Sequence, residues 1–335
     1  IPVAIRIPDE MIERVSSFVK PVKLNRLGGF FNCITIFRHD PFIDWFLDSP
    51  QVDCRRSGAA IHLQKATRIP DFGGEVLNFT INKYIHATME KDESGRVKVE
   101  YSSEVPSGSG LGTSGALNVG LIATILGHKK SPEKIAEMAF QFESILENKG
   151  GRQDQWASVH GGFNHLMFIG DNVEVLPFEP MKSSKNWLKK HFIIADSKIE
   201  HNSGTLHDSI WSRYSSGDED VINGLHKIRS AARKMSDGIQ RDRRELVVES
   251  LRDVCEGVDL MDPSLHDPFR SIIQPLVVSK SVMAWKALGA GAGGTVGVLC
   301  SPMSRQNVIQ KLEKEGWEII DWDYDEQGMR IVSDK

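Results

Sequence analysis

Residues 106–116 read Pro-Ser-Gly-Ser-Gly-Leu-Gly-Thr-Ser-Gly-Ala, with four glycines and four hydroxyl side chains in eleven positions. An apolar, helix-compatible segment, residues 117–126, follows directly. A glycine-rich loop that opens a helix binds phosphate, because small residues let the backbone approach an anion and the free N–H groups favour negative charge. No Gly-Lys-Ser/Thr follows the glycines, so the loop is not a Walker A sequence. A plain helix cap after a flexible turn is the simpler alternative, and the length of the pattern disfavours it.

Two more segments accompany this loop. Residues 150–156 are Gly-Gly-Arg-Gln-Asp-Gln-Trp, with Gly-Gly-Phe-Asn at 161–164. Residues 288–294 are Leu-Gly-Ala-Gly-Ala-Gly-Gly, followed by an apolar run that ends at Cys300. In this order the three segments resemble the signature motifs of the GHMP kinase superfamily, and the middle one is similar to the sugar-1-kinase branch. That branch contains the D-glycero-D-manno-heptose 7-phosphate kinases and the L-fucokinases. The resemblance covers about residues 61–335.

The resemblance implies an α+β fold with two domains and an active site between them. Residues 61–185 would form an N-terminal α/β domain that binds ATP, and residues 186–335 a ferredoxin-like C-terminal domain. The boundary is expected in the polar stretch 182–186. Strand-like and helix-like segments alternate in both halves, which by itself favours a mixed fold. Residues 1–60 would be an extension, or the tail of a preceding domain, and their aromatic residues indicate that they pack.

Periodicity and turn residues predict the elements in more detail. A helix is expected to begin at Ser131 with Pro132 in its first turn, and two long helices at 218–239 and 243–258. The expected strands lie at 81–89, 96–101, 165–169, 173–176, 191–195, 296–300, 317–320 and 329–332, and a last helix at 304–315.

Phosphoryl transfer requires neutralised phosphates, a bridging metal ion and an oriented hydroxyl nucleophile. The resemblance places ATP on the glycine loop, at Pro106, Gly108, Ser109, Gly110, Leu111, Gly112, Thr113 and Ser114. Magnesium prefers hard oxygen ligands and keeps several waters. In the family, the matching serine and an acidic residue on the helix before the catalytic motif bind it, which implies Ser114 and Glu143. Glu147 is a competing position, and a solvated helix carboxylate is the simpler interpretation of Glu143.

Asp154 follows a Gly-Gly helix stop and is expected in a loop beside Gln153 and Trp156. A carboxylate there can accept the proton of a substrate hydroxyl or orient that hydroxyl, and the family's catalytic aspartate occupies the matching position. Arg68 matches the basic residue of the family's first motif, which pairs with that aspartate and faces the transferred phosphate. A permanently charged, fork-shaped guanidinium suits this role. The simpler alternatives are a turn-capping aspartate and a surface arginine.

The sequence departs from the sugar kinases after Arg68. They carry a Gly-Gly-x-x-Asp stretch that supplies a sugar-binding aspartate, whereas here only Pro70-Asp71-Phe72 separates Ile69 from Gly73. Either part of the sugar site has been lost, or residues of a mobile loop are absent between well-matched flanks, and the flanks favour the second. The candidate substrate residues are Gly73, Gly74, Gln153, His201, Gly291 and Gly293.

The composition limits which partners and which cell compartment the protein can be expected to have. The 335 residues are 40% hydrophobic and 26% charged, with a formal net charge of −4, which gives no electrostatic reason to expect nucleic acid or a membrane as partner. No apolar run reaches the ~18 residues of a membrane-spanning helix. The four cysteines, Cys33, Cys54, Cys255 and Cys300, are scattered and predict reduced thiols in the cytoplasm. Ile1 is not an initiator methionine, which indicates preceding residues.

The sequence therefore predicts an ATP- and Mg²⁺-dependent kinase that phosphorylates the anomeric hydroxyl of a small sugar. The Gly-Gly-Phe-Asn motif favours a heptose 7-phosphate-like substrate, and the N-terminal extension favours L-fucose. Two alternatives stay open. One is a catalytically silent nucleotide-binding regulator on the same fold. The other is a different small-molecule GHMP enzyme, which the Gln-Asp-Gln context at 153–155 disfavours. The oligomeric state is not predicted.

Overall fold

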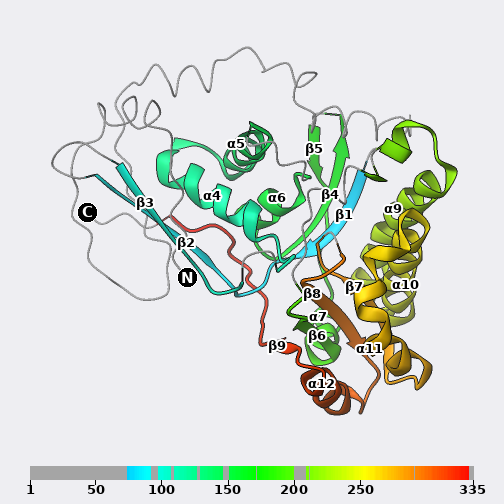
Figure 1. The fold of residues 1–335 in the computed structure, drawn as a ribbon. Helices are drawn as coiled ribbons and strands as arrows, with labels where there is room; N and C mark the ends of the chain where they lie inside the picture. The colour runs from blue at the N-terminus through cyan, green and yellow to red at the C-terminus, as the bar shows by residue number, and fades with distance from the viewer. Residues whose placement is uncertain are drawn as a thin grey trace.

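The computed structural model describes residues 74–91, 97–106, 109–126, 129–145, 151–170, 172–199, 209–210, 212–289 and 291–331. Three sheets and two groups of helices form the described fold (Figure 1). The mixed α+β architecture expected from the sequence is confirmed.

The first sheet has the order β1-β4-β5, formed by Gly74–Phe79, Phe163–Ile169 and Asn172–Val175. All its pairs are antiparallel, with Gly74 opposite Phe168 and Phe79 opposite Phe163. Side chains alternate between the two faces of a strand, and Val76, Leu166 and Phe168 lie on the same face. There they pack with helices α4 (Thr113–Leu126), α5 (Pro132–Ile145) and α6 (Gln153–His160).

A separate hairpin, β2 (Ile85–Lys91) and β3 (Val97–Ser103), lies beside α4 (Figure 1). Gly120 is at this contact: a Cβ added to it would lie 3.1 Å from the Cβ of Ala87. Glycine at this point of α4 therefore lets the helix approach the hairpin closely.

The C-terminal sheet has the order β7-β8-β6-β9 and is antiparallel at every pair. Its strands are Val282–Ala287 (β7), Thr295–Cys300 (β8), Phe192–Asp196 (β6) and Glu318–Ile320 (β9). Long helices separate β6 from β7, and α12 (Arg305–Lys314) separates β8 from β9. This β-α-β-β-α-β succession is the ferredoxin-like arrangement.

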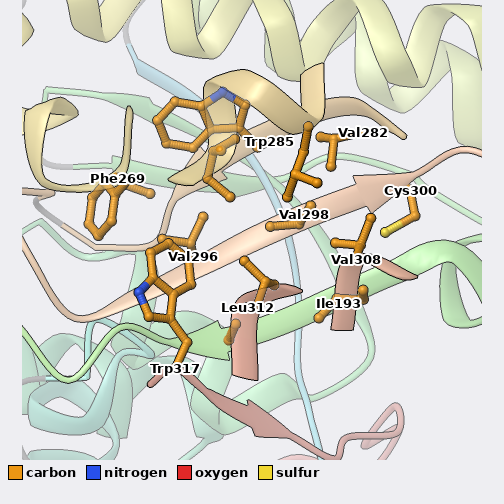
Figure 2. Close-up of a cluster of buried hydrophobic side chains, with 14 residues drawn as sticks. Ile193, Phe269, Val282, Trp285, Val296, Val298, Cys300, Val308, Leu312 and Trp317 are labelled. Atoms are coloured by element: carbon orange, nitrogen blue, oxygen red, sulfur yellow. The ribbon is translucent and has the colours of Figure 1, made fainter. Parts of the chain in front are cut away.

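One face of this sheet carries a large core cluster (Figure 2). Trp285, Val296 and Val298 from the strands meet Phe269 of α11 (Asp267–Val278) and Leu312 of α12. Every residue of β8 is buried, which explains its uninterrupted apolar sequence. The opposite face packs on β1 through Leu299 and Phe192, which share a second cluster with Leu77 and Phe79.

Helices α9 (Glu219–Gln240) and α10 (Arg244–Met261) pack against each other (Figure 1). Helix α9 contacts β1 of the first sheet, and α10 contacts β7 of the C-terminal sheet. Asp218 caps α9 by accepting hydrogen bonds from the backbone N–H groups of Asp220 and Val221, as expected for a helix N-cap. Short helices α7 (Lys182–His191) and η2 (Pro263–Leu265) complete the described elements.

Helix α4 begins at Thr113, directly after Gly112 of the phosphate loop, as expected. Other element predictions need correction. The polar stretch 182–186 is the start of helix α7, so it is not an extended linker; the domain boundary itself stays a prediction. Residues 329–331 form no strand. Helix α11 and strand β7 were not predicted.

Candidate active site

The phosphate loop forms a tight turn ahead of α4. Gly110 and Gly112 have positive φ angles of 76° and 73°, a region that side chains with a Cβ rarely adopt. The hydroxyls of Ser109 and Thr113 are 3.1 Å apart and hydrogen-bonded, which joins the turn to the first residue of the helix. Backbone N–H groups at a helix N-terminus are unpaired within the helix, so this geometry suits an anion. Pro106 and Ser114 are exposed at its two ends, and Leu111 packs beneath it.

The C-terminal glycine loop lies directly against the phosphate loop. A Cβ on Gly110 would lie 2.3 Å from the carbonyl oxygen of Leu288, and a Cβ on Gly289 would lie 2.7 Å from the Cα of Gly110. The backbone N–H of Thr295 donates to the carbonyl of Ser109 at 3.0 Å. Two glycines thus allow a backbone contact between segments about 180 residues apart, and this contact fixes the phosphate loop on the ferredoxin-like sheet.

Ser114 and Glu143 meet beside the loop. The Ser114 hydroxyl donates to one carboxylate oxygen of Glu143, and the Gln155 side-chain amide donates to the other. Glu143 is buried, so it is not the solvated helix carboxylate of the simpler interpretation. A buried carboxylate next to a hydroxyl at a phosphate loop offers the hard oxygen ligands that Mg²⁺ takes together with phosphate oxygens and water. These two residues therefore fit the ion. Glu147 lies outside the described residues.

Asp154 is in the first turn of helix α6, not in a loop as expected. Arg152 is the residue before helix α6, and Gln153 to His160 contain no helix breaker. The Asp154 side chain lies against the phosphate loop: a Cβ on Gly112 would be 3.1 Å from its Cγ, and a Cβ on Gly115 would be 2.6 Å from its Cβ. Only glycines leave room for a carboxylate so close to the loop.

Three effects determine the pKa of the Asp154 carboxyl. Burial raises the pKa of its carboxyl to about 6, the negative charge of Glu143 adds to the rise, and the Lys286 ammonium opposes it. A carboxyl whose pKa lies just below neutrality is ionised at pH 7 and still basic, which is the property that a general base needs.

A network that the sequence did not predict holds the start of α6. The Arg152 side chain is buried, donates to the carbonyl of Gly170 at 3.3 Å and forms an ion pair with Glu137 at 3.2 Å. The guanidinium also lies 4.6 Å from the centre of the Phe140 ring. Trp156 donates its indole N–H to the same Glu137 at 2.7 Å. These contacts tie the α6 start, and with it Asp154, to α5 and to the end of β4.

The sequence analysis also missed Lys286, whose charge lowers the pKa of Asp154. It belongs to β7, two residues before the Leu288 carbonyl that touches the phosphate loop. The one signal that could have found it was a charged residue inside the otherwise apolar run 282–288.

The candidate substrate residues are scattered in the structure. Gly74 begins β1 and Gln153 begins α6, and both are exposed. Gly293 is buried, and the Cβ position of Gly291 is 3.0 Å from Leu265 of η2. Both glycines therefore lie in a packed part of the C-terminal loop, and a role for them in substrate binding stays a prediction. Arg68, Gly73, Gly108 and His201 lie outside the described residues.

This geometry can be compared with known proteins. Residues 79–162 match the family model described as the GHMP kinases N-terminal domain. The chain is also 26% identical over 321 residues to the D-glycero-alpha-D-manno-heptose 7-phosphate kinase of Campylobacter jejuni, covering 77% of this chain and 91% of that protein. The chain belongs to the GHMP kinase superfamily.

Two further proteins resemble the chain in part or in fold. The mevalonate kinase of Thermococcus onnurineus is 32% identical over 114 residues, 32% of this GHMP kinase and 34% of that enzyme. A solved structure of a D-glycero-D-manno-heptose 1-phosphate kinase from Bacteroides thetaiotaomicron superposes with a TM-score of 0.59 at 20% identity, covering 77% of this chain and 89% of that chain. In the described part of the chain, no helix is both long and apolar enough to cross a bilayer.

Proposed function

We propose that this GHMP kinase transfers the terminal phosphate of ATP to the anomeric hydroxyl of a sugar, with a heptose 7-phosphate-like sugar or L-fucose as its substrate. The observation that carries the proposal is the contact of Asp154 with Gly112 and Gly115. It places a carboxylate of raised pKa beside a helix N-terminus that suits phosphate. A base and a phosphate cradle in contact are the arrangement that phosphoryl transfer to a hydroxyl requires.

Each residue of the site then has a task. The backbone N–H groups of Gly110, Gly112 and Thr113 bind the phosphates of ATP, and Ser114 and Glu143 hold the magnesium ion. Bound Mg²⁺ would neutralise charge on the β- and γ-phosphates. Asp154 accepts or orients the hydroxyl proton of the sugar. Arg68, which the family motif matches, would face the transferred phosphate.

The choice of a sugar rests on sequence likeness. The Campylobacter jejuni relative, whose name specifies heptose 7-phosphate, aligns with most of this chain. The mevalonate kinases of Thermococcus onnurineus and Pyrococcus furiosus match only about a third of it, at 32% and 31% identity, and the mevalonate kinase of Arabidopsis thaliana matches 66% of it at 24% identity. The Gln153-Asp154-Gln155 sequence also resembles the motif of the sugar kinases, and the amide of Gln155 contacts Glu143.

An ADP-release assay over a sugar panel tests the proposal. The panel contains D-glycero-D-manno-heptose 7-phosphate, L-fucose, D-mannose and mevalonate, each with Mg²⁺-ATP. We expect saturable, Mg²⁺-dependent turnover with one of the first two sugars and none with mevalonate. Saturable ATP binding without turnover on any sugar would favour the silent regulator, and turnover on mevalonate alone would favour the other GHMP enzyme class.

A further inference from the structure

The last described segment of the chain leaves the ferredoxin-like sheet and returns to the N-terminal half. After β9, residues 321–331 run back towards helices α4 and α6, at the red end of the chain in Figure 1. The backbone N–H of Asp325 donates to the carbonyl of Thr80 at 3.0 Å, and Tyr324 forms an antiparallel bridge with Ile81. This C-terminal segment therefore pairs with the residues that directly follow β1.

The C-terminal segment also contacts the first two residues of the Gly-Gly-Phe-Asn motif, residues 161–164. Gly162 donates its backbone N–H to the carbonyl of Asp325 at 2.6 Å. Gly161 is the C-cap of α6, and a Cβ added to it would lie 2.1 Å from the nitrogen of Gly328. Gly161 and Gly328 are both buried and have positive φ angles of 68° and 62°. A residue with a side chain fits at neither side of this backbone contact.

The other two residues of the motif make contacts inside the protein as well. The Phe163 ring packs against the ring of Tyr324 in the C-terminal segment, with centroids 5.3 Å apart. Asn164 is buried, and its amide donates to the carbonyl of Gly161 at 3.1 Å and to the side-chain oxygen of Asn78 at 3.2 Å. All four residues of the motif are thus used in protein contacts, which suits a docking site better than a sugar-binding loop.

Helix α6 connects this docking site to Asp154. The helix has eight residues, which at the rise of an α-helix is a length of about 12 Å. Asp154 is in its first turn, whereas the Met329 N–H of the C-terminal segment donates to the carbonyl of Val159 in its last turn at 3.3 Å. The last carbonyls of a helix have no partner within it. Within α6, the Ser158 hydroxyl donates to the carbonyl of Asp154 at 2.7 Å. A shift at the end of so short a helix therefore displaces its start.

A buried carboxylate shapes the C-terminal segment where it meets α6. Asp325 is buried, and one of its carboxylate oxygens accepts from the Gln327 N–H at 3.2 Å and from the Arg330 guanidinium at 3.0 Å. These bonds close a turn that holds Gly328 against the helix end. Beyond the turn, Met329 packs against the cluster formed by α4, α5 and α6.

We propose that the Gly-Gly-Phe-Asn motif is the docking site of the C-terminal segment, and that this docking positions Asp154 through α6. Gly161 and Gly328 are then positioning residues. The effect on Asp154 rests on the proposed function, whereas the docking does not. Because the segment continues from β9, the ferredoxin-like half holds the end of α6, while Arg152 ties the start of the helix to α5.

Gly328→Val tests the docking without any substrate. Its Cβ would lie 2.5 Å from the nitrogen of Gly161. Gly316→Val is the matched control, because Gly316 has a positive φ of 85° and no atom within 4 Å of its Cβ position. In Gly328→Val, the amides of Gly162 and Met329 should exchange hydrogen about tenfold faster or more, since their bonds cross the contact and local opening governs exchange. The control should match the wild type, and unchanged exchange at Gly162 in folded Gly328→Val would overturn the docking.

Steady-state kinetics with the sugar that turns over then test the effect on Asp154. We expect the kcat of Gly328→Val to fall by about 10²-fold, the scale of a misplacement of roughly 1 Å. The KM for the sugar and the affinity for ATP should stay unchanged. A raised KM for the sugar at unchanged kcat would show that the motif contacts the sugar. An unchanged kcat beside faster exchange would show that the docking does not position Asp154, and either result would contradict the proposal.

Arg330→Met takes the place of Gly328→Val if that variant does not fold. It removes the bond to Asp325 that closes the turn, so it should give faster exchange at Gly162 and a lower kcat at unchanged KM. Arg330→Lys keeps the charge and should restore most of kcat. Unchanged exchange and kcat in Arg330→Met would overturn the proposal. A wild type that turns over no sugar would sink the proposed function and leave the exchange result standing.

Discussion

The Asp154 side chain lies against two glycines of the phosphate loop, Gly112 and Gly115. Its carboxyl pKa of about 6 sets the pH range in which it can serve as base. Because the base must be ionised, kcat/KM should fall as pH drops through about 6 and be flat above about 7. A pH–rate profile with no ionisation between 5 and 7 would exclude Asp154 as the base.

Replacing Asp154 with Asn keeps the shape and removes the charge. Turnover should fall by about 10²–10⁴-fold, the scale of acid–base catalysis, while the affinity for ATP changes little because the loop and the metal ligands carry it. Single-turnover kinetics and calorimetry measure the two quantities separately. Lost ATP affinity with unchanged chemistry would show that the roles are wrongly assigned.

The same variant should be more stable than the wild type at pH 7. The folded state raises the carboxyl pKa from 3.8 to about 6, so the folded protein binds the proton more tightly and its stability falls as pH rises through this window. At pH 7, Asp154→Asn should gain about 1–3 kcal/mol in the free energy of unfolding. Urea unfolding should show the gain shrinking as pH falls towards 4, and a gain that grows there would contradict the burial argument.

Substitutions of Glu143 and Ser114 should affect magnesium and ATP, whereas a substitution of Asp154 should affect turnover. Replacing Glu143 with Gln removes a metal ligand and also the negative charge that raises the pKa of Asp154. We expect a higher Mg²⁺ requirement and a higher apparent KM for ATP, together with an acid limb of kcat/KM that moves to lower pH. Ser114→Ala should raise the Mg²⁺ requirement without moving that limb by as much. Unchanged magnesium titrations in both variants would remove the pair from the metal site.

Among the elements, the contact between the two glycine loops is the most sensitive to substitution. Gly110→Val combines a strained positive φ with a Cβ 2.3 Å from the Leu288 carbonyl. We expect the affinity for an ATP analogue to fall by about 10- to 100-fold, which is about 1.4–2.8 kcal/mol. Gly151→Val is the matched control, since no atom lies within 4 Å of its Cβ position. Equal affinities in the folded Gly110 variant and the control would place ATP elsewhere.

Element prediction succeeded where periodicity was strong and failed where packing decides. The long helices α9 and α10 and the strand β8 were predicted to within a few residues, because amphipathic spacing and a buried apolar run are local signals. The sequence predicts a loop at the start of α6, because its residues are polar and its stabilising contacts with Glu137 and Gly170 come from other elements. Helix α7 begins in a stretch of serine and lysine whose only apolar anchors, Trp187 and Leu188, come later.

At the scale of the molecule, the sequence predicted which motifs build the site but not how they meet. The three motifs resemble a family, and that resemblance implied the α+β fold and an active site between two halves. The Ser114–Glu143–Gln155 contacts join α4, α5 and α6, and the Leu288–Gly110 contact joins segments about 180 residues apart. Neither follows from the spacing of the motifs, because each depends on how separate elements pack.

The most direct test of the central claim is phosphorus NMR of the reaction with the sugar that turns over in the panel. If Asp154 activates the anomeric hydroxyl, the product signal should be a sugar 1-phosphate split by the anomeric proton, formed in step with ADP and absent in Asp154→Asn. Phosphate on any other carbon, or only inorganic phosphate beside ADP, would contradict an anomeric sugar kinase.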